Sequence, residues 1–191
     1  MAYWCRKLVL DHEAKLRIRL RELHHLKGAR KASQASKRLA RGKYLVNLRE
    51  RNAHLAPKLE DVDVGKIALA MLYFGEGGKN IRKARVFIGN SDPAFIRLFL
   101  DLFRRCYILD EKKFRLTVMC RADQNTSKLT RFWSKVTSIP LSRCYPARID
   151  PRTVGKPTLR PNYKGVCCLD YFSAEVFNEL LQLIKLLSEG R

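Results

Sequence analysis

The sequence predicts an α+β fold with a basic helical extension at its N-terminus. Apolar residues recur at helical spacing in some segments and alternate residue by residue in others, and the two kinds of segment are interleaved along the chain. The chain has 39 lysines and arginines against 18 aspartates and glutamates, a formal net charge of +21 in 191 residues. Such a surplus predicts a polyanionic partner: nucleic acid first, an anionic membrane surface as the alternative.

Residues 1–58 form the predicted extension, and residues 59–191 the main domain. Leucines recur at helical spacing within residues 11–55, where Gly28 and Gly42 are candidate interruptions. Lysines and arginines occupy the other faces, and so thin an apolar stripe cannot form a core alone. This segment therefore either packs on the main domain or lies along nucleic-acid phosphates; an ordinary solvated basic face is the alternative.

The main domain is expected to begin with a helix over residues 64–74, with Asp63 as its N-cap. The segment is apolar nearly all round, so we expect protein to cover its whole surface. It ends in Gly75, Glu76, Gly77 and Gly78. A carboxylate at the negative end of the helix dipole is destabilising unless a cation compensates it. A hard divalent ion bound through oxygen ligands would provide this compensation. A buried core helix that is simply ended by a glycine cap is the alternative reading of residues 67–78.

Residues 79–81 and 85–89 predict a ribbon of two strands with Arg82 and Lys83 at its turn. Alternation places Val86 and Ile88 on one face and Arg85 with Phe87 on the other. A basic ribbon of this kind fits the major groove of duplex DNA, where arginine and lysine read guanine edges. An exposed hairpin with ordinary surface charges is the alternative.

Two more helices and a strand follow. Ser91, Asp92 and Pro93 predict the start of a helix that runs to about residue 106. Residues 114–121 alternate as a half-buried strand, whose outer face is basic and carries Arg115 and Arg121. Residues 123–126 cap a helix over 127–137, in which Trp133 is expected to be a core residue.

Residues 140–162 contain five of the seven prolines and predict a long irregular loop. Beside a sheet on DNA, this loop would reach backbone phosphates through basic residues that include Arg148, Arg152, Lys156 and Arg160. A strand over 164–172 and a helix over 174–187 complete the domain. The six cysteines lack metal-ligand spacing, so we expect them to be reduced thiols in a reducing compartment. We expect the protein to be soluble and intracellular, in the cytoplasm and associated with the nucleoid. No segment has the length and hydropathy of a membrane span.

Residues 69–77 read LAMLYFGEG, which resembles the motif that names the LAGLIDADG homing endonucleases. Glu76 falls on the metal-binding acid of that motif, Met71 replaces its first glycine and Phe74 its first acid. The order of elements downstream, with NSDP at 90–93 and FWSKVTSIP at 132–140, resembles small prokaryotic LAGLIDADG-like proteins over roughly residues 60–188. Residues 3–10 resemble the end of a helix-turn-helix recognition helix, so the extension is a candidate remnant of that module.

The resemblance implies a saddle-shaped antiparallel sheet backed by helices, built from two helix-plus-hairpin halves, that lies in the major groove. It implies a homodimer, because single-motif members act in pairs, with Ala68, Met71, Leu72 and Gly75 at the helix-to-helix contact. Each subunit would contribute Glu76, next to Gly75, as a ligand of Mg²⁺ for cleavage of double-stranded DNA. Lys79, Gln124 and Lys164 are candidate catalytic residues from their places at strand ends, and Lys79 is also a candidate DNA contact.

Two other functions stay open at this point. The first is a DNA-binding transcription regulator that has kept the fold without cleavage, which glutamate in place of aspartate and the missing acid at Phe74 would suit. The second is an RNA-binding intron maturase with the same basic saddle. Dependence on metal, on Glu76 and on duplex DNA as opposed to RNA distinguishes the three.

Overall fold

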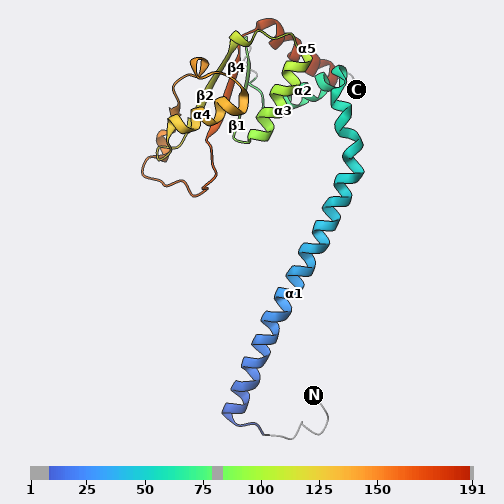
Figure 1. Ribbon diagram of the computed structural model, residues 1–191, viewed down its shortest axis with the longest axis vertical. Coiled ribbons are helices and arrows are strands. Elements are labelled where there is room, and N and C mark those ends of the chain that lie inside the picture. Colours follow the sequence, from blue (N-terminus) through green and yellow to red (C-terminus); the bar gives the residue numbers. More distant parts are fainter. Residues whose placement is uncertain (1–8, 79–83, 190–191) are drawn as a thin grey trace. The chain divides into compact units, whose positions relative to one another are not determined.

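The computed structural model describes residues 9–78 and 84–189. The chain divides into two compact units, Met1–Ala56 and Pro57–Arg191 (Figure 1). Across the described ranges, every helix is too short or too polar to cross a membrane.

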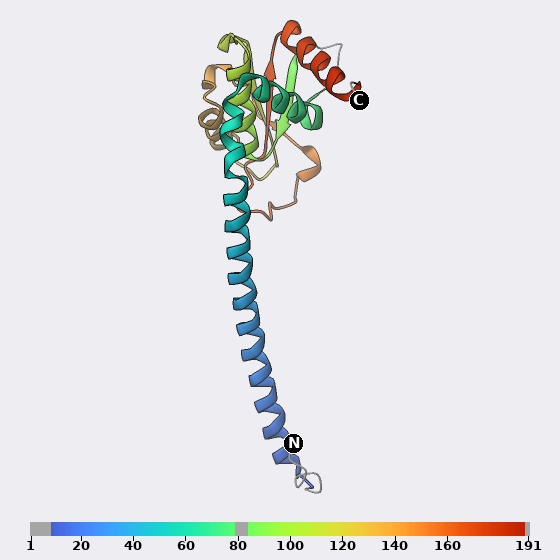
Figure 2. The same cartoon turned by 90° about the vertical axis from the view of Figure 1, so that its right-hand side faces the viewer.

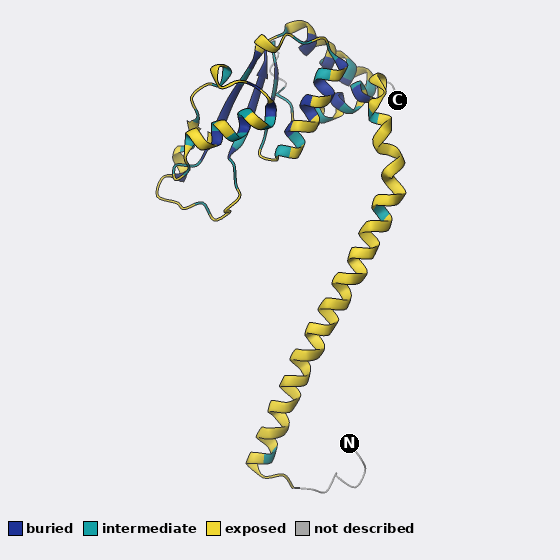
Figure 3. Ribbon diagram, in the orientation of Figure 1, coloured by how far each residue is buried: buried dark blue, intermediate teal, exposed yellow. Residues whose placement is uncertain are grey.

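The first unit is dominated by one continuous helix, α1 (His12–Asn52). Its N-cap is Asp11, whose Oδ1 accepts a hydrogen bond from the backbone N–H of Ala14 at 2.6 Å. The helix continues through Gly28 and Gly42, so neither glycine interrupts it. None of its 41 residues is buried, as the colouring of Figure 3 shows. A 3-10 helix, η2 (Ala53–Glu60), follows.

Helix α2 (Val62–Glu76) begins two residues earlier than expected, and its N-cap is Asp61. The prediction of Asp63 as the cap is therefore wrong: Oδ1 of Asp61 accepts hydrogen bonds from the N–H groups of Asp63 and Val64 at 2.9 and 3.0 Å. Both aspartates precede the apolar run, and the sequence pattern does not distinguish an aspartate that caps from one in the first turn. Helix α3 (Pro93–Cys106) starts as predicted, with Asp92 as its cap and proline in its first turn.

The sheet contains β1 (Val86–Asn90), β2 (Phe114–Cys120), β3 (Arg148–Ile149) and β4 (Val166–Tyr171) among the described residues. Their spatial order is β1-β4-β2-β3. β4 pairs antiparallel with β1 and β2, whereas β3 runs parallel to β2. The expectation of a wholly antiparallel sheet is thus wrong at β3. This strand lies in the segment expected to be irregular, and two residues are too few to give an alternating pattern.

Helices α2, α3, α4 (Thr126–Thr137) and α5 (Ala174–Glu189) contribute to one hydrophobic core with alternate residues of the sheet. In Figure 2, α5 lies at the end of the colour scale, and it contacts α2 and β1. Phe103 of α3 packs against Phe114 and Tyr171, with ring centroids 6.1 and 5.2 Å away. Trp133 of α4 is fully buried, which confirms its assignment to the core, and its Nε1 donates to the carbonyl of Lys164 at 2.7 Å.

One side of α2 is not covered by the described chain. Ile67 and Met71 are 45% and 44% exposed, although Leu69, Ala70 and Tyr73 of the same helix are fully buried. The expectation that protein covers the entire surface of this helix is therefore wrong for the single chain. The apolar composition of α2 exceeds what its contacts with α3, α5 and β1 require.

Candidate nucleic-acid interface

The face of the sheet opposite the core carries side chains from all four described strands. Register places Phe87, Asp170 and Arg115 in one row across β1, β4 and β2, and places Val166, Met119 and Arg148 in another. Cys168 lies between these rows and, unlike its neighbours Cys167 and Leu169, is not part of the core cluster. This second set of alternating side chains forms what we call the outer face of the sheet. Its charged groups are mostly arginines.

Arg85, the residue before β1, lies on the outer face beside Asp170. Its Nε lies 2.6 Å from Oδ1 of Asp170, a residue that is nearly buried. The guanidinium also stacks near the rings of Phe87 and Phe172, 5.8 and 5.6 Å from their centroids. An arginine held by a buried carboxylate and two aromatic rings has little freedom to follow a nucleic acid. Arg85 therefore shapes this face, with only part of its donors left for a ligand.

Arg115 and Arg148 are two further arginines of the outer face. Arg115 is partly exposed, and its Nη1 donates to the carbonyls of Lys112 and Phe114 at 2.8 and 2.7 Å. Arg148 is exposed on β3, opposite Met119. A guanidinium has five N–H donors, so both residues keep donors for a phosphate or a base edge.

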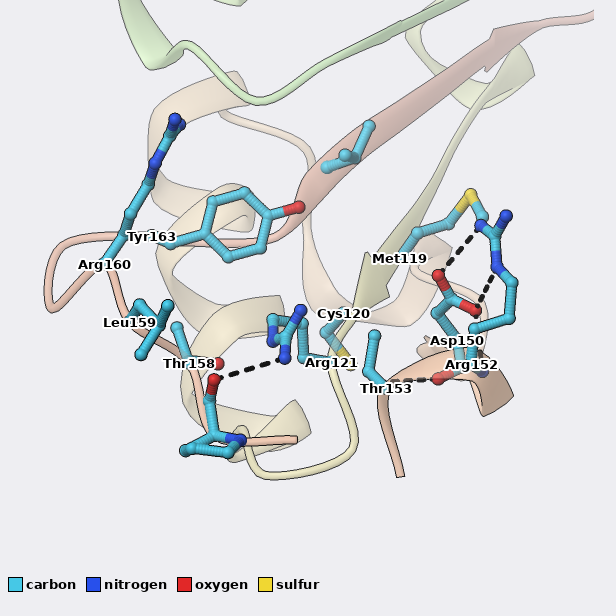
Figure 4. Close-up of a pocket in the computed structure, with 12 residues that line it drawn as sticks. Met119, Cys120, Arg121, Asp150, Arg152, Thr153, Thr158, Leu159, Arg160 and Tyr163 are labelled. Atoms are coloured by element: carbon cyan, nitrogen blue, oxygen red, sulfur yellow. Dashed lines mark hydrogen bonds and ion pairs between the residues drawn. The ribbon is translucent and has the colours of Figure 1, made fainter. Parts of the chain in front are cut away.

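A cavity of about 550 Å³ lies where β2 ends and the chain enters β4 (Figure 4). Three of the predicted DNA contacts line it: Arg121, Arg152 and Arg160. Tyr163, Thr153 and Thr158 add hydroxyl groups to the same wall. A partly apolar wall that carries cationic side chains suits an anionic group attached to an apolar body, such as a nucleotide.

The loop over this cavity is held by hydrogen bonds. Nη2 of Arg121 donates to the carbonyls of Lys156 and Pro157 at 2.7 and 3.3 Å. Both carboxylate oxygens of Asp123 accept from Thr158, from its hydroxyl at 2.7 Å and its N–H at 2.6 Å. Hydrogen bonding by Thr158 lowers the pKa of Asp123. The loop thus forms one wall of the cavity, and its position depends on Arg121 and Asp123, which follow the end of β2.

Asp150 is the acidic group in the cavity wall. Its Oδ1 and Oδ2 each accept from the guanidinium of Arg152 at 2.9 Å, and this hydrogen bonding lowers the pKa of the carboxyl. The side chain of Arg152 is 86% exposed and that of Asp150 is 26% exposed, so solvent reaches the pair. Exposed pairs contribute little to stability, so a phosphate can compete for Arg152 at small cost.

Glu76 is the last residue of α2, and the glycines that follow it fix where the helix ends. The N–H of Gly77 donates to the carbonyl of Tyr73 at 2.8 Å, and a Cβ at Gly77 would lie 2.4 Å from the Tyr73 ring. The N–H of Gly78 donates to the carbonyl of Phe87 at 2.8 Å, which ties the chain to β1. The hydroxyl of Tyr73 donates to the carbonyl of Gly78 at 2.7 Å. The exposed carboxylate of Glu76 is therefore carried on a rigid helix end beside the edge of the sheet.

The described part of a single chain contains no cluster of ligands for the expected Mg²⁺. Within residues 9–78 and 84–189, no three histidines, cysteines or acids come close enough to hold a metal ion. Mg²⁺ prefers six oxygen ligands, of which proteins commonly supply one or two carboxylates while water and phosphate supply the rest. One chain supplies one such carboxylate, that of the exposed Glu76 at the helix end. Two copies of Glu76 brought together would supply two.

The other candidate catalytic residues lie elsewhere or outside the described part. Nε2 of Gln124 donates to the carbonyl of Tyr163 at 2.7 Å, while its Oε1 accepts from the N–H of Arg121 at 3.1 Å. Nζ of Lys164 lies over the ring of Phe132, 5.7 Å from its centroid. Both residues therefore belong to the junction between β2, α4 and β4, whereas Glu76 lies beside β1. Lys79, Arg82 and Lys83, with the expected strand over 79–81, fall outside the described residues.

The exposed side of α2 is a line of small and apolar residues. Val64, Ile67 and Met71 recur at helical spacing and are 40%, 45% and 44% exposed. Gly75 continues the line, and a Cβ added there would meet no described atom within 4 Å. Of the predicted interface residues, Met71 and Gly75 are exposed, whereas Ala68 and Leu72 are half-buried against the core. We call Val64, Ile67, Met71 and Gly75 the α2 stripe.

Several residues of the cavity were not expected from the sequence. Thr153, Thr158 and Tyr163 join Arg121 only because the loop folds back over the end of β2. The loop is held there by hydrogen bonds between residues about 35 apart, such as the two between Asp123 and Thr158. No periodic signal accompanies contacts of that kind. The prolines and arginines of the loop were the only features that marked it.

The chain was also compared with known proteins. No protein-family model, no curated protein and no solved structure matches it.

Proposed function

We propose that this protein is a metal-dependent endonuclease of the LAGLIDADG homing type that binds double-stranded DNA as a homodimer. The observation that carries the proposal is the outer face of the sheet, which lies opposite the helices and bears Arg115 and Arg148. A cavity lined by three further arginines adjoins it. Guanidinium groups on a sheet surface and its bordering loop match the base edges and phosphates of a duplex.

The homodimer is supported by the α2 stripe. A line of apolar residues ending in an unobstructed glycine permits a second copy of the helix to approach closely. With a twofold axis that runs along the two helices, contact along this line would bring together their C-terminal ends, and with them two copies of Glu76. The symmetry also predicts a DNA site made of two similar half-sites in inverted order.

Glu76 is the residue to which we assign the role of metal ligand. Bound between two glutamates, Mg²⁺ would lower the pKa of coordinated water and neutralise charge on the phosphate. The chain's own contribution is positional: Gly77, Gly78 and Tyr73 fix the helix end that carries the carboxylate. The arginines of the outer face would hold the duplex in register while leaving the scissile phosphate accessible to this edge.

Cleavage of a randomised library of duplex DNA in the presence of Mg²⁺ tests this function. We expect site-specific cuts by the wild-type protein, and their loss both with EDTA and in Glu76→Gln. Glu76 is exposed, so this substitution should change the free energy of unfolding by no more than about 0.5 kcal/mol. Glu60→Gln, at another exposed glutamate of the same unit, is the matched control and should cut like wild type.

A DNA-binding regulator without nuclease activity is the second candidate. It is favoured by the single acid at the end of α2, where the motif's other acid is replaced by Phe74. In that case wild type and Glu76→Gln would bind the same duplex equally, and neither would cut it with any divalent metal. Equal binding without cleavage would overturn the nuclease assignment, and a preference for structured RNA over duplex DNA would overturn both.

A further inference from the structure

Helix α1 is the largest part of the chain that the proposed function does not use. Between residues 12 and 52 it has 13 lysines and arginines against three glutamates. None of these cations forms an ion pair with another described residue. No residue of the helix is buried (Figure 3). Because α1 has no buried residue and its cations form no ion pair with described acids, its charged surface is available to bind a partner.

The charge in the middle of α1 lies along one side. Residues 27–43 contain seven cations and no acid. Six of the seven fall at i, i+3, i+4 and i+7 spacing, within an arc of about 120° when successive residues turn by ~100°. These six, with Gln34 among them, form what we call the cationic stripe: Lys27, Arg30, Lys31, Lys37, Arg38 and Arg41. The stripe occupies the positions where an amphipathic helix would place apolar residues.

The side chains that complete this segment are small. Gly28, Ala29, Ala32, Ser33, Ala35 and Ser36 cover most of the other side, and Leu39 is its one large apolar residue. A helix of such narrow cross-section enters a confined groove readily, and the major groove of B-DNA is about 12 Å wide. The same composition disfavours insertion of the helix into a membrane interface, because insertion requires a broad apolar face.

The absence of aromatic residues from 27–43 narrows the partner further. Proteins that hold single strands stack bases on aromatic rings, which this segment cannot do. The major groove of duplex RNA is too deep and narrow for side chains to read. The stripe is about 21 Å long at ~1.5 Å per residue, and duplex DNA carries about twelve phosphates over that length. Its dimensions and charge therefore match a short stretch of B-form DNA.

We propose that the cationic stripe of α1 is a second DNA-binding element, which lies along duplex DNA and contacts its phosphates. It is distinct from the outer face of the sheet and belongs to the other compact unit of the chain. The proposal depends neither on cleavage nor on the binding of DNA by the sheet. Its contacts are with the backbone, so it adds affinity for duplexes of any sequence.

The test uses the full-length protein and a fluorescent duplex of about 24 base pairs, with the dissociation constant measured by anisotropy over a range of salt concentrations. The stripe variant is Arg30→Gln, Arg38→Gln and Arg41→Gln combined. Its matched control is Arg17→Gln, Arg21→Gln and Lys43→Gln, which removes equal charge from the other side of the same helix. Glutamine preserves helix propensity, and far-UV circular dichroism verifies helicity in both.

We expect the stripe variant to lower the slope of log affinity against log salt by about 2.7, since each phosphate contact contributes about 0.9. Affinity at ~0.15 M salt should fall by about 100-fold on the same account. The control variant should retain the wild-type slope. Equal losses in both variants would mean that only total charge matters, and would overturn the proposal, as would no loss in either.

Two further arms separate other partners and the proposed function. The proposal is wrong if the stripe variant loses affinity for phosphatidylserine vesicles or for duplex RNA while its affinity for DNA is unchanged. Arg115→Gln combined with Arg148→Gln reports on the outer face of the sheet alone. If that variant binds like wild type while the stripe variant is weakened, the role of the sheet fails and the role of α1 stands.

Discussion

Gly65 and Gly75 belong to the same helix but have different surroundings, which makes them a matched pair for testing the homodimer. A methyl group at Gly75 would meet no described atom within 4 Å, whereas one at Gly65 would lie 3.0 Å from Sγ of Cys106. We expect Gly75→Ala to leave stability unchanged or to raise it by up to about 1 kcal/mol, because alanine favours the helix. Self-association should weaken at least tenfold, as measured by sedimentation equilibrium, since the methyl group separates the two copies of α2.

Gly65→Ala should behave in the opposite way. The added methyl group presses α2 away from α3, and overpacking of this kind typically costs about 1–3 kcal/mol. Chemical denaturation would register that loss, while the association constant of the folded protein stays near the wild-type value. Unchanged association in Gly75→Ala would place any dimer contact elsewhere than the α2 stripe.

For individual residues, the sequence predicted those roles that follow from the residue type and its neighbours along the chain. Asp92 with Pro93 starts α3, and Trp133 is a buried core residue, as expected from their types and neighbours. Arg85 shows where such reasoning stops. Its partner Asp170 is 85 positions away and is brought beside it by the pairing of β1 with β4. Side-chain chemistry alone gave Arg85 as a basic residue of a ribbon, without the carboxylate that holds it.

Cys167 of the central strand β4 makes the stability of the protein depend on pH in the alkaline range. Burial, followed by the neighbouring thiols Cys168 and Cys144, raises the pKa of Cys167 well above its ordinary value of 9.0. The folded state therefore favours the protonated thiol. Its contribution to stability is complete below pH 9 and is lost as the pH rises further, because only the unfolded chain then releases the proton.

Unfolding by urea at a series of pH values would measure this effect. A single such thiol contributes a decline of up to about 1.4 kcal/mol per pH unit above its unfolded pKa. We expect Cys167→Ala to lower stability at every pH, owing to the lost packing, but to make the alkaline decline shallower. Cys144→Ala should change the slope less, because Cys144 is only half-buried. A wild-type curve that is flat between pH 8 and 10 would contradict this account.

Elements with a clear period were predicted well. Apart from β3, the described helices and strands from α2 to α5 follow the expected order, and β2 (Phe114–Cys120) ends one residue before the predicted alternation does. β3 was missed because it is two residues long and depends on hydrogen bonds such as that from the N–H of Asp150 to the carbonyl of Cys120 at 2.9 Å. Strands that exist only through pairing leave no mark in the sequence around them.

At the scale of the whole molecule, the excess of positive charge is shared by two units with different architectures. The unit Pro57–Arg191 places arginines on a sheet and an ordered loop, and the unit Met1–Ala56 places cations on one side of a helix. The charge surplus was evident from composition. Its division into an outer face and a stripe required the register of the sheet and the continuity of α1 through both of its glycines.

Helix α1 also has a thermal consequence. Without buried residues, its 41 residues owe their helicity to intrinsic propensity and length, which produce a broad helix–coil transition. We expect ellipticity at 222 nm to decline gradually on heating, well before the cooperative loss of the near-UV signal from the packed unit. One sharp transition shared by both signals would contradict this. At moderate temperature α1 would be partly unfolded, and binding of a partner along it would restore its helicity. The helical content of α1 would therefore report whether the partner is bound.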